Sequence, residues 1–173
     1  VKRESDTDVS AVVQSIIDQV RTNGDAALVE LTRSLDNYDC DLSQIRVSDD
    51  EIKESIRLCT TDQLDALRFA ADRIAEYHRR QLPENLDYTD GAGVQLGYRW
   101  TPIEAVGVYV PGGTAAYPSS VLMNVVPAKI AGVRRLVMMV PTPKGEINPL
   151  VLAAANIMEI EEIYRVGGAQ AIA

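Results

Sequence analysis

The first part of the chain carries apolar residues at helical spacing. Residues 5–24 place valine and isoleucine at intervals of three and four, which is typical of a helix that buries one face. The residues predicted to form this buried face are Val9, Val12, Val13, Ile16, Ile17 and Val20. Gly24 fits the position just after a helix, so we expect this helix to end there.

Three further helices are expected before residue 82. The first spans residues 25–35, and the second begins with Ser48 and Glu51, which have the spacing of a capping box. The third spans about 62–81 and turns these apolar residues inward: Leu64, Leu67, Ala71, Ile74 and Tyr77. Residues 45–47 form a possible short strand ahead of the capping box.

The pattern changes after residue 83. Residues 84–93 are polar and rich in turn-forming residues, which favours a linker. Residues 94–103 alternate with period two, which favours extended strands.

Strands and helices then alternate to the end of the chain. Short apolar runs predict strands over 106–110, 136–140 and 163–166, and helices are expected over 118–131 and 147–158. Such a βαβαβ series predicts parallel, buried strands with right-handed crossovers. The fold class is therefore α/β: an N-terminal helical segment followed by half of a Rossmann-like parallel sheet.

Composition narrows the classes of partner. The 173 residues are 46% hydrophobic, enough for a real core, and the net charge of −8 argues against a nucleic-acid-binding protein. No apolar run approaches a membrane span, and no secretory signal is present, so we expect a cytoplasmic protein without a membrane partner. Cys40 and Cys59 form no disulfide framework and are expected as free thiols. Because the chain starts at Val1 and stops at Ala173 within a predicted helical turn, we expect both ends to be cut.

Two strands end in a pair of glycines. Residues 106–113 read Val-Gly-Val-Tyr-Val-Pro-Gly-Gly, and residues 164–173 read Tyr-Arg-Val-Gly-Gly-Ala-Gln-Ala-Ile-Ala. A strand that ends in glycines before a helix lets a ligand approach bare backbone N–H groups. Two such turns in one parallel sheet open on the same edge, where α/β proteins bind nucleotides. Neither turn carries the G-x-G-x-x-G or P-loop pattern.

Two side chains beside these turns, and a third on the helix that follows the first turn, are candidates for polar contacts. Tyr109 is the penultimate residue of the predicted strand over 106–110, where its ring either lies against a cofactor or packs in the core with a bonded hydroxyl. Gln170 follows the second turn, where its amide either binds a ligand or faces solvent. Asn124 lies in an apolar helical run, so we expect it to be buried and bonded to a neighbouring loop.

The residues for zinc or triad chemistry are missing. His78 is the only histidine, and it stands beside arginines at a predicted helix end. One histidine and two separated cysteines do not make a zinc site or a catalytic triad. We therefore expect no catalytic residue and no metal ligand in this chain.

Residues 106–132 and 166–173 closely resemble the L-histidinol dehydrogenase family. Residues 20–28, Val-Arg-Thr-Asn-Gly-Asp-Ala-Ala-Leu, also resemble the family's helix-turn-helix segment. The resemblance runs over the whole chain in order. It implies that the chain corresponds to the N-terminal two-fifths of the family's length.

The resemblance implies an NAD-dependent, zinc-containing enzyme of histidine biosynthesis. The family oxidises L-histidinol to L-histidine in two hydride transfers through the aldehyde, as a homodimer with domains related to aldehyde dehydrogenase. Its NAD contacts match Tyr109 and Gln170, whereas a third NAD contact, the zinc ligands and the acid–base pair match positions past Ala173. We therefore expect the chain alone to be inactive. Residues 1–105 would belong to one incomplete Rossmann-like domain, and residues 106–173 would begin the NAD-binding domain.

Two other functions stay open at this point. Another aldehyde dehydrogenase-like oxidoreductase would need a nucleophilic cysteine farther along the chain. A non-enzymatic nucleotide-binding module would need to fold alone with its own C-terminus, against which the uncapped end at Ala173 argues.

Overall fold

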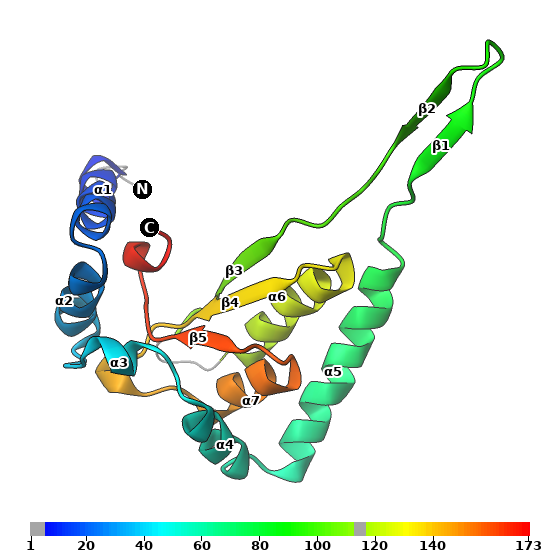
Figure 1. Ribbon diagram of the computed structural model, residues 1–173. Coiled ribbons are helices and arrows are strands. Elements are labelled where there is room, and N and C mark those ends of the chain that lie inside the picture. Colours follow the sequence, from blue (N-terminus) through cyan, green and yellow to red (C-terminus); the bar gives the residue numbers. More distant parts are fainter. Residues whose placement is uncertain (1–5, 113–116) are drawn as a thin grey trace.

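The computed structural model describes residues 6–112 and 117–173, and its N-terminal half is helical (Figure 1). The four expected helices are present, together with one additional short helix, α3. Their bounds are α1 Asp6–Asn23, α2 Asp25–Asp36, α3 Leu42–Ile45, α4 Asp49–Arg57 and α5 Thr61–Arg79.

Local signals set the boundaries of these helices. Gly24 has a φ of 55° after α1, and its N–H donates to the carbonyl of Val20, as expected of a helix end. The predicted capping box is also present at α4. The Glu51 N–H donates to Ser48 Oγ at 3.3 Å, and the Ser48 N–H donates to Glu51 Oε2 at 2.9 Å.

The C-terminal half contains the predicted parallel sheet. Its strands are β3 Ala105–Tyr109, β4 Arg135–Met139 and β5 Glu162–Tyr164, paired in the order β3-β4-β5. The connecting helices are α6 Pro118–Ala131 and α7 Pro149–Ile157, and the short 3-10 helices are η1 Pro143–Gly145 and η2 Ala169–Ala171. The βαβαβ prediction is therefore confirmed.

The two faces of the sheet have different environments. Val108, Met138 and Ile163 form one row across the three strands, and all three are buried in the core with α6 and α7. The next row points to the opposite face, because side chains alternate along a strand. That row holds Tyr109, Met139 and Tyr164, which are only half-buried. In Figure 1, α1, α2 and η2 lie at the end of the sheet where these residues stand.

The predicted apolar faces of two helices are buried only in part. Val12 on α1 is 59% exposed, and Val9 and Val13 are exposed as well. Their spacing identifies an apolar face but does not say what covers it, and no element within the described part of the chain lies over these three residues. Tyr77 on α5 is 62% exposed, and its ring packs edge-on against His78 rather than in the core.

The linker prediction for residues 84–93 is wrong. Residues in this stretch form β1 Leu86–Thr89, which pairs with β2 Gln95–Tyr98 as an antiparallel hairpin. The expected extended conformation after residue 94 is confirmed over β2. The possible strand at 45–47 is reduced to one antiparallel bridge between Arg46 and Tyr164, because Ile45 ends α3.

Candidate functional site

The two glycine turns meet on Pro141, the residue that follows β4 and Val140. A Cβ added to Gly112 would lie 2.4 Å from the carbonyl oxygen of Pro141. A Cβ added to Gly167 would lie 2.5 Å from the Cβ of Pro141. Only glycine allows these approaches, since carbon atoms in contact normally stay about 3.5–4.0 Å apart. The three strand ends therefore converge, as the sequence predicts; Gly113 lies outside the described residues.

Tyr109 links the first strand to the second glycine turn. Its hydroxyl accepts a hydrogen bond from the N–H of Gly168 at 3.1 Å. Gly168 has a φ of +57°, a backbone conformation that residues other than glycine rarely adopt. The hydroxyl is thus bonded within the protein, as the core alternative expects, whereas the ring is only half-buried at the strand end.

Gln170 lies on the other side of the same turn. The residue is only 3% exposed, so the solvent-facing alternative is wrong. Its Oε1 has no hydrogen-bond partner among the described residues, and a Cβ on Gly168 would stand 2.5 Å from it. A buried polar atom without a partner costs stability, so this oxygen is an unsatisfied acceptor beside the second glycine turn.

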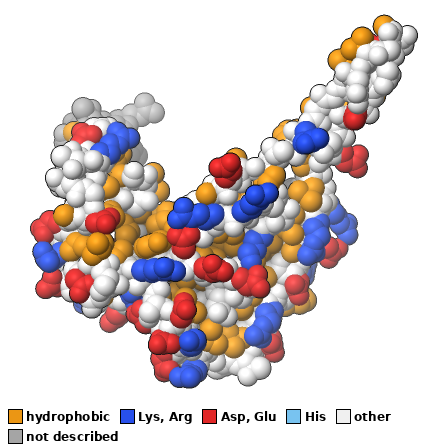
Figure 2. All heavy atoms as spheres, in the orientation of Figure 1, with side chains coloured by type: hydrophobic (Ala, Val, Ile, Leu, Met, Phe, Trp, Pro, Cys, Tyr) orange, Lys and Arg blue, Asp and Glu red, His pale blue; other side chains and the backbone are white. Residues whose placement is uncertain are grey.

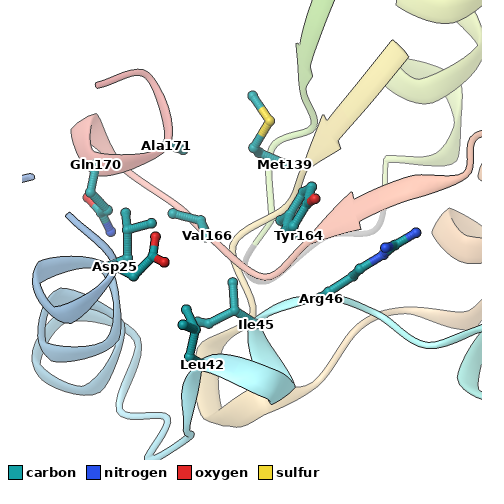
Figure 3. A pocket seen from close by; sticks show the side chains of 10 residues that line it. Asp25, Leu42, Ile45, Arg46, Met139, Tyr164, Val166, Gln170 and Ala171 are labelled. Carbon is teal, nitrogen blue, oxygen red and sulfur yellow. The ribbon is translucent and has the colours of Figure 1, made fainter. Parts of the chain in front are cut away.

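A hollow of about 440 Å³ opens beside Gln170 (Figure 3). Met139 and Tyr164, from the sheet row that also contains Tyr109, form one wall. The other lining residues come from α2, α3, η2 and the segments beside them: Asp25, Leu28, Leu42, Ile45, Arg46, Val166, Gln170 and Ala171. A mostly apolar hollow with a few polar groups is typical of a ligand site.

Three polar atoms of α2 and of the turn after β4 were not expected from the sequence. Asp36 Oδ2 lies 3.5 Å from where a Cβ on Gly167 would stand, and burial raises the pKa of Asp36. The hydroxyls of Thr32 and Thr142 are fully buried, and neither they nor Asp36 Oδ2 has a partner in the described structure. A charged residue at a helix end normally indicates solvent exposure, so no local signal identifies Asp36 as part of the turn's surroundings.

A buried arginine fixes the chain between β5 and the second turn. Arg165 donates to the carbonyl of Gln44 at 3.0 Å and to the carboxylate of Glu51. Burial disfavours the charge of Glu51, but hydrogen bonds from Ser48 and Arg165 outweigh it and hold the pKa of Glu51 below its usual value. Glu51 belongs to the capping box of α4, and the backbone N–H of Arg165 donates to the carbonyl of Ile45, so the role of this ion pair is structural.

The described residues do not form a metal site. No group of three or more histidine, cysteine, aspartate or glutamate residues comes together in residues 6–112 and 117–173.

The prediction that Asn124 is buried is wrong. The residue is exposed on α6, and its Nδ2 donates to the carbonyl of Ser120 in the same helix at 2.7 Å. None of the helices in the described ranges is long and apolar enough to cross a membrane.

A family model described as histidinol dehydrogenase matches residues 1–173. The chain belongs to the histidinol dehydrogenase family. Among curated members, it is 59% identical over 172 residues to histidinol dehydrogenase of Bradyrhizobium diazoefficiens, covering 99% of this chain and 40% of that protein. It is 54% identical over 173 residues to histidinol dehydrogenase of Rhodopseudomonas palustris, covering 100% of this chain and 40% of that protein.

A solved histidinol dehydrogenase has the same fold over this region. The crystal structure of the enzyme from Elizabethkingia anophelis matches with a TM-score of 0.91 and 34% identity, covering 99% of this chain and 39% of that chain. The chain thus spans about 40% of the length of the curated histidinol dehydrogenases that it matches.

Proposed function

We propose that the protein carrying this chain oxidises L-histidinol to L-histidine, by way of the aldehyde, with NAD as the oxidant. The observation that carries the proposal is the second glycine turn, where the Gly168 N–H meets the Tyr109 hydroxyl and the buried Gln170 oxygen has no partner. Family membership supports the reaction, and the unpaired oxygen beside this turn supports putting the cofactor there.

The residues present fit a dinucleotide. The glycines let the two turns close on Pro141 at the carboxyl edge of the parallel sheet, which is the edge where α/β proteins bind dinucleotides. In this proposal the Tyr109 ring flanks the cofactor, and the Gln170 amide gains the hydrogen bond that its oxygen lacks. NAD, when bound, accepts the hydride from the substrate. The residues of this chain bind and orient it.

We further propose the remaining family features for the full natural protein. The zinc ligands and the acid–base residues lie outside residues 1–173, which leaves binding rather than chemistry to this chain. Residues 1–105 and 106–173 belong to two Rossmann-like domains of the aldehyde dehydrogenase-like kind. The protein is a cytoplasmic homodimer whose substrate is L-histidinol.

Calorimetric titration of NAD into the full natural protein tests the cofactor assignment. Gln170→Ala and Tyr109→Ala each remove one contact, worth about 1–2 kcal/mol, so the dissociation constant should rise roughly 5- to 30-fold. Asn124→Ala, on an exposed face of α6, is the matched control and should leave NAD affinity unchanged. Unchanged affinity in both site variants would refute the assignment.

A second assay tests where the chemistry resides. The 173-residue chain alone, mixed with L-histidinol, NAD and zinc, should produce no NADH above background. Clear turnover would show that the catalytic groups lie within this chain and would overturn that part of the proposal.

A further inference from the structure

The β1–β2 hairpin projects from the body of the molecule. We call residues 85–100 the arm; in Figure 1 it extends away from the helices and the parallel sheet, beyond the end of α5. Figure 2 shows apolar side chains along it toward its tip. The arm is therefore a surface that the other described residues of this chain leave uncovered.

The register divides the arm into an apolar and a polar face. Leu86 pairs with Tyr98, and Tyr88 pairs with Leu96, so these four side chains share one face. The residues of the opposite face are Asp87, Thr89, Gln95 and Gly97, and the Gln95 amide donates there to the Asp87 carboxylate at 3.0 Å. Such a two-sided ribbon is typical of a strand pair that packs one face against another surface.

The arm is an ordered element with its own internal bonds. Asp90 Oδ1 accepts from the N–H groups of Ala92 at 2.8 Å and Val94 at 2.9 Å and closes the turn. At the base, Asn85 Oδ1 accepts from the Trp100 N–H at 2.7 Å. A single two-stranded hairpin is at best marginally stable in water, so this face needs a partner surface.

We infer that the apolar face of the arm packs against the same face of a second copy of the protein. The leucines occupy one diagonal of the face and the tyrosines the other. A two-fold axis in the plane of the ribbon, either along the strands or across them, therefore places each leucine opposite a tyrosine of the second copy. A closed dimer contact needs this self-complementarity, and alternating large and smaller side chains provide it.

The exposed surface is large enough to form the greater part of a dimer contact, although not all of it. Tyr98 and Trp100 are 55% and 58% exposed and pack edge to face, with ring centroids 6.2 Å apart. Together with Leu86, Tyr88, Val94 and Leu96, they expose roughly 600 Å² of apolar side chain, taking ~200 Å² for each aromatic residue. A standard interface buries about 800 Å² on each partner. The inference rests on the homodimer proposed above and adds the surface through which it forms.

Sedimentation of the full natural protein over a range of concentrations tests the inference. Leu96→Arg places a charge on the apolar face and should raise the dimer dissociation constant at least tenfold. Thr89→Arg, on the polar face of the same hairpin, is the matched control and should change it less than twofold. A protein that is monomeric throughout, or a Leu96→Arg variant that dimerises like the parent, would overturn the inference.

A crosslinking experiment covers the case in which Leu96→Arg unfolds the arm. Leu96→Cys is a mild change and should give a covalent dimer with a short bismaleimide, whereas Gln95→Cys on the polar face should not. Equal crosslinking of both variants, or of neither, would exclude the apolar face as the contact. Oxidation of L-histidinol by the parent protein, assayed separately, keeps a failure here distinct from a failure of the proposed function.

Discussion

Replacing Gly167 by alanine tests whether the second glycine turn depends on close contact with Pro141. The added Cβ would lie 2.5 Å from the Cβ and 3.2 Å from the Cα of Pro141. The Cα belongs to backbone between β4 and η1, so the contact is not relieved by rotating a side chain. We therefore expect the turn or the segment at Pro141 to shift.

Two opposing effects set the magnitude. Overpacking of a close contact costs about 1–3 kcal/mol. Replacing glycine by alanine also restricts the unfolded chain, which stabilises the folded protein by about 0.4–1 kcal/mol. The net loss for Gly167→Ala is therefore about 0–2.6 kcal/mol, centred near 1.3 kcal/mol.

Urea unfolding of the full natural protein measures this loss. Gly91→Ala is the control, because a Cβ there meets nothing within 4 Å and Gly91 has no positive φ. Its stability should stay within about 0.5 kcal/mol of the parent. NAD affinity should fall for Gly167→Ala and not for Gly91→Ala. Equal stability and equal NAD affinity of the two variants would refute the claim that the turn needs a bare glycine.

Two carboxylates give pH-dependent predictions of opposite sign. Burial raises the pKa of Asp36 above its ordinary 3.8, so its ionisation costs stability as the pH rises through the raised pKa. Asp36→Asn should therefore gain stability relative to the parent between pH 4 and pH 7 in urea unfolding, and a constant difference would contradict this. The pKa of Glu51 is held below its ordinary 4.5, so its contribution is present above that value and is lost as the pH falls. Glu51→Gln should lower the free energy of unfolding by about 1–3 kcal/mol at pH 7, which is less than for a fully buried pair because Glu51 is half-exposed. This loss should shrink below about pH 4.5 in the same assay. A loss that persists unchanged at low pH would argue against the pairing with Arg165.

The parallel-sheet half of the fold is predictable because its signals are local. Each strand is a short apolar run, and proline or glycine marks the adjoining turns and helix ends. Helix α6 begins at Pro118 and ends before Gly132, whose φ of 89° gives the left-handed end that a glycine favours. The predicted bounds of 118–131 match this helix.

The hairpin and the exposed helix face show where local signals are insufficient. β1 is only four residues long, and its alternation of Leu86 and Tyr88 with polar residues is too short to distinguish from a polar linker. For α1, the apolar spacing is correct, but Val12 is exposed because periodicity describes a face and not its partner.

The candidate site divides in the same way. The sequence points to Tyr109 and Gln170 because each lies beside a glycine turn at a strand end, and the structure brings both to Gly168. Asp36 and Thr142 escape sequence reasoning because their burial depends on contact between α2 and turns more than 100 residues away. The backbone part of such a site is encoded locally, whereas its polar surroundings come from tertiary packing.

The site therefore joins the two halves of the chain. Its glycine turns and sheet row come from residues after 105, whereas Asp25, Leu42 and Asp36 come from the helical segment. If residues 1–105 and 106–173 belong to different domains, as we propose, the hollow and the second turn lie at their junction. A ligand bound there contacts both parts, so its binding energy also stabilises their packing. Arg165 acts in the same direction, because its hydrogen bonds to Gln44 and Glu51 hold the residues just before the second turn against the helical segment.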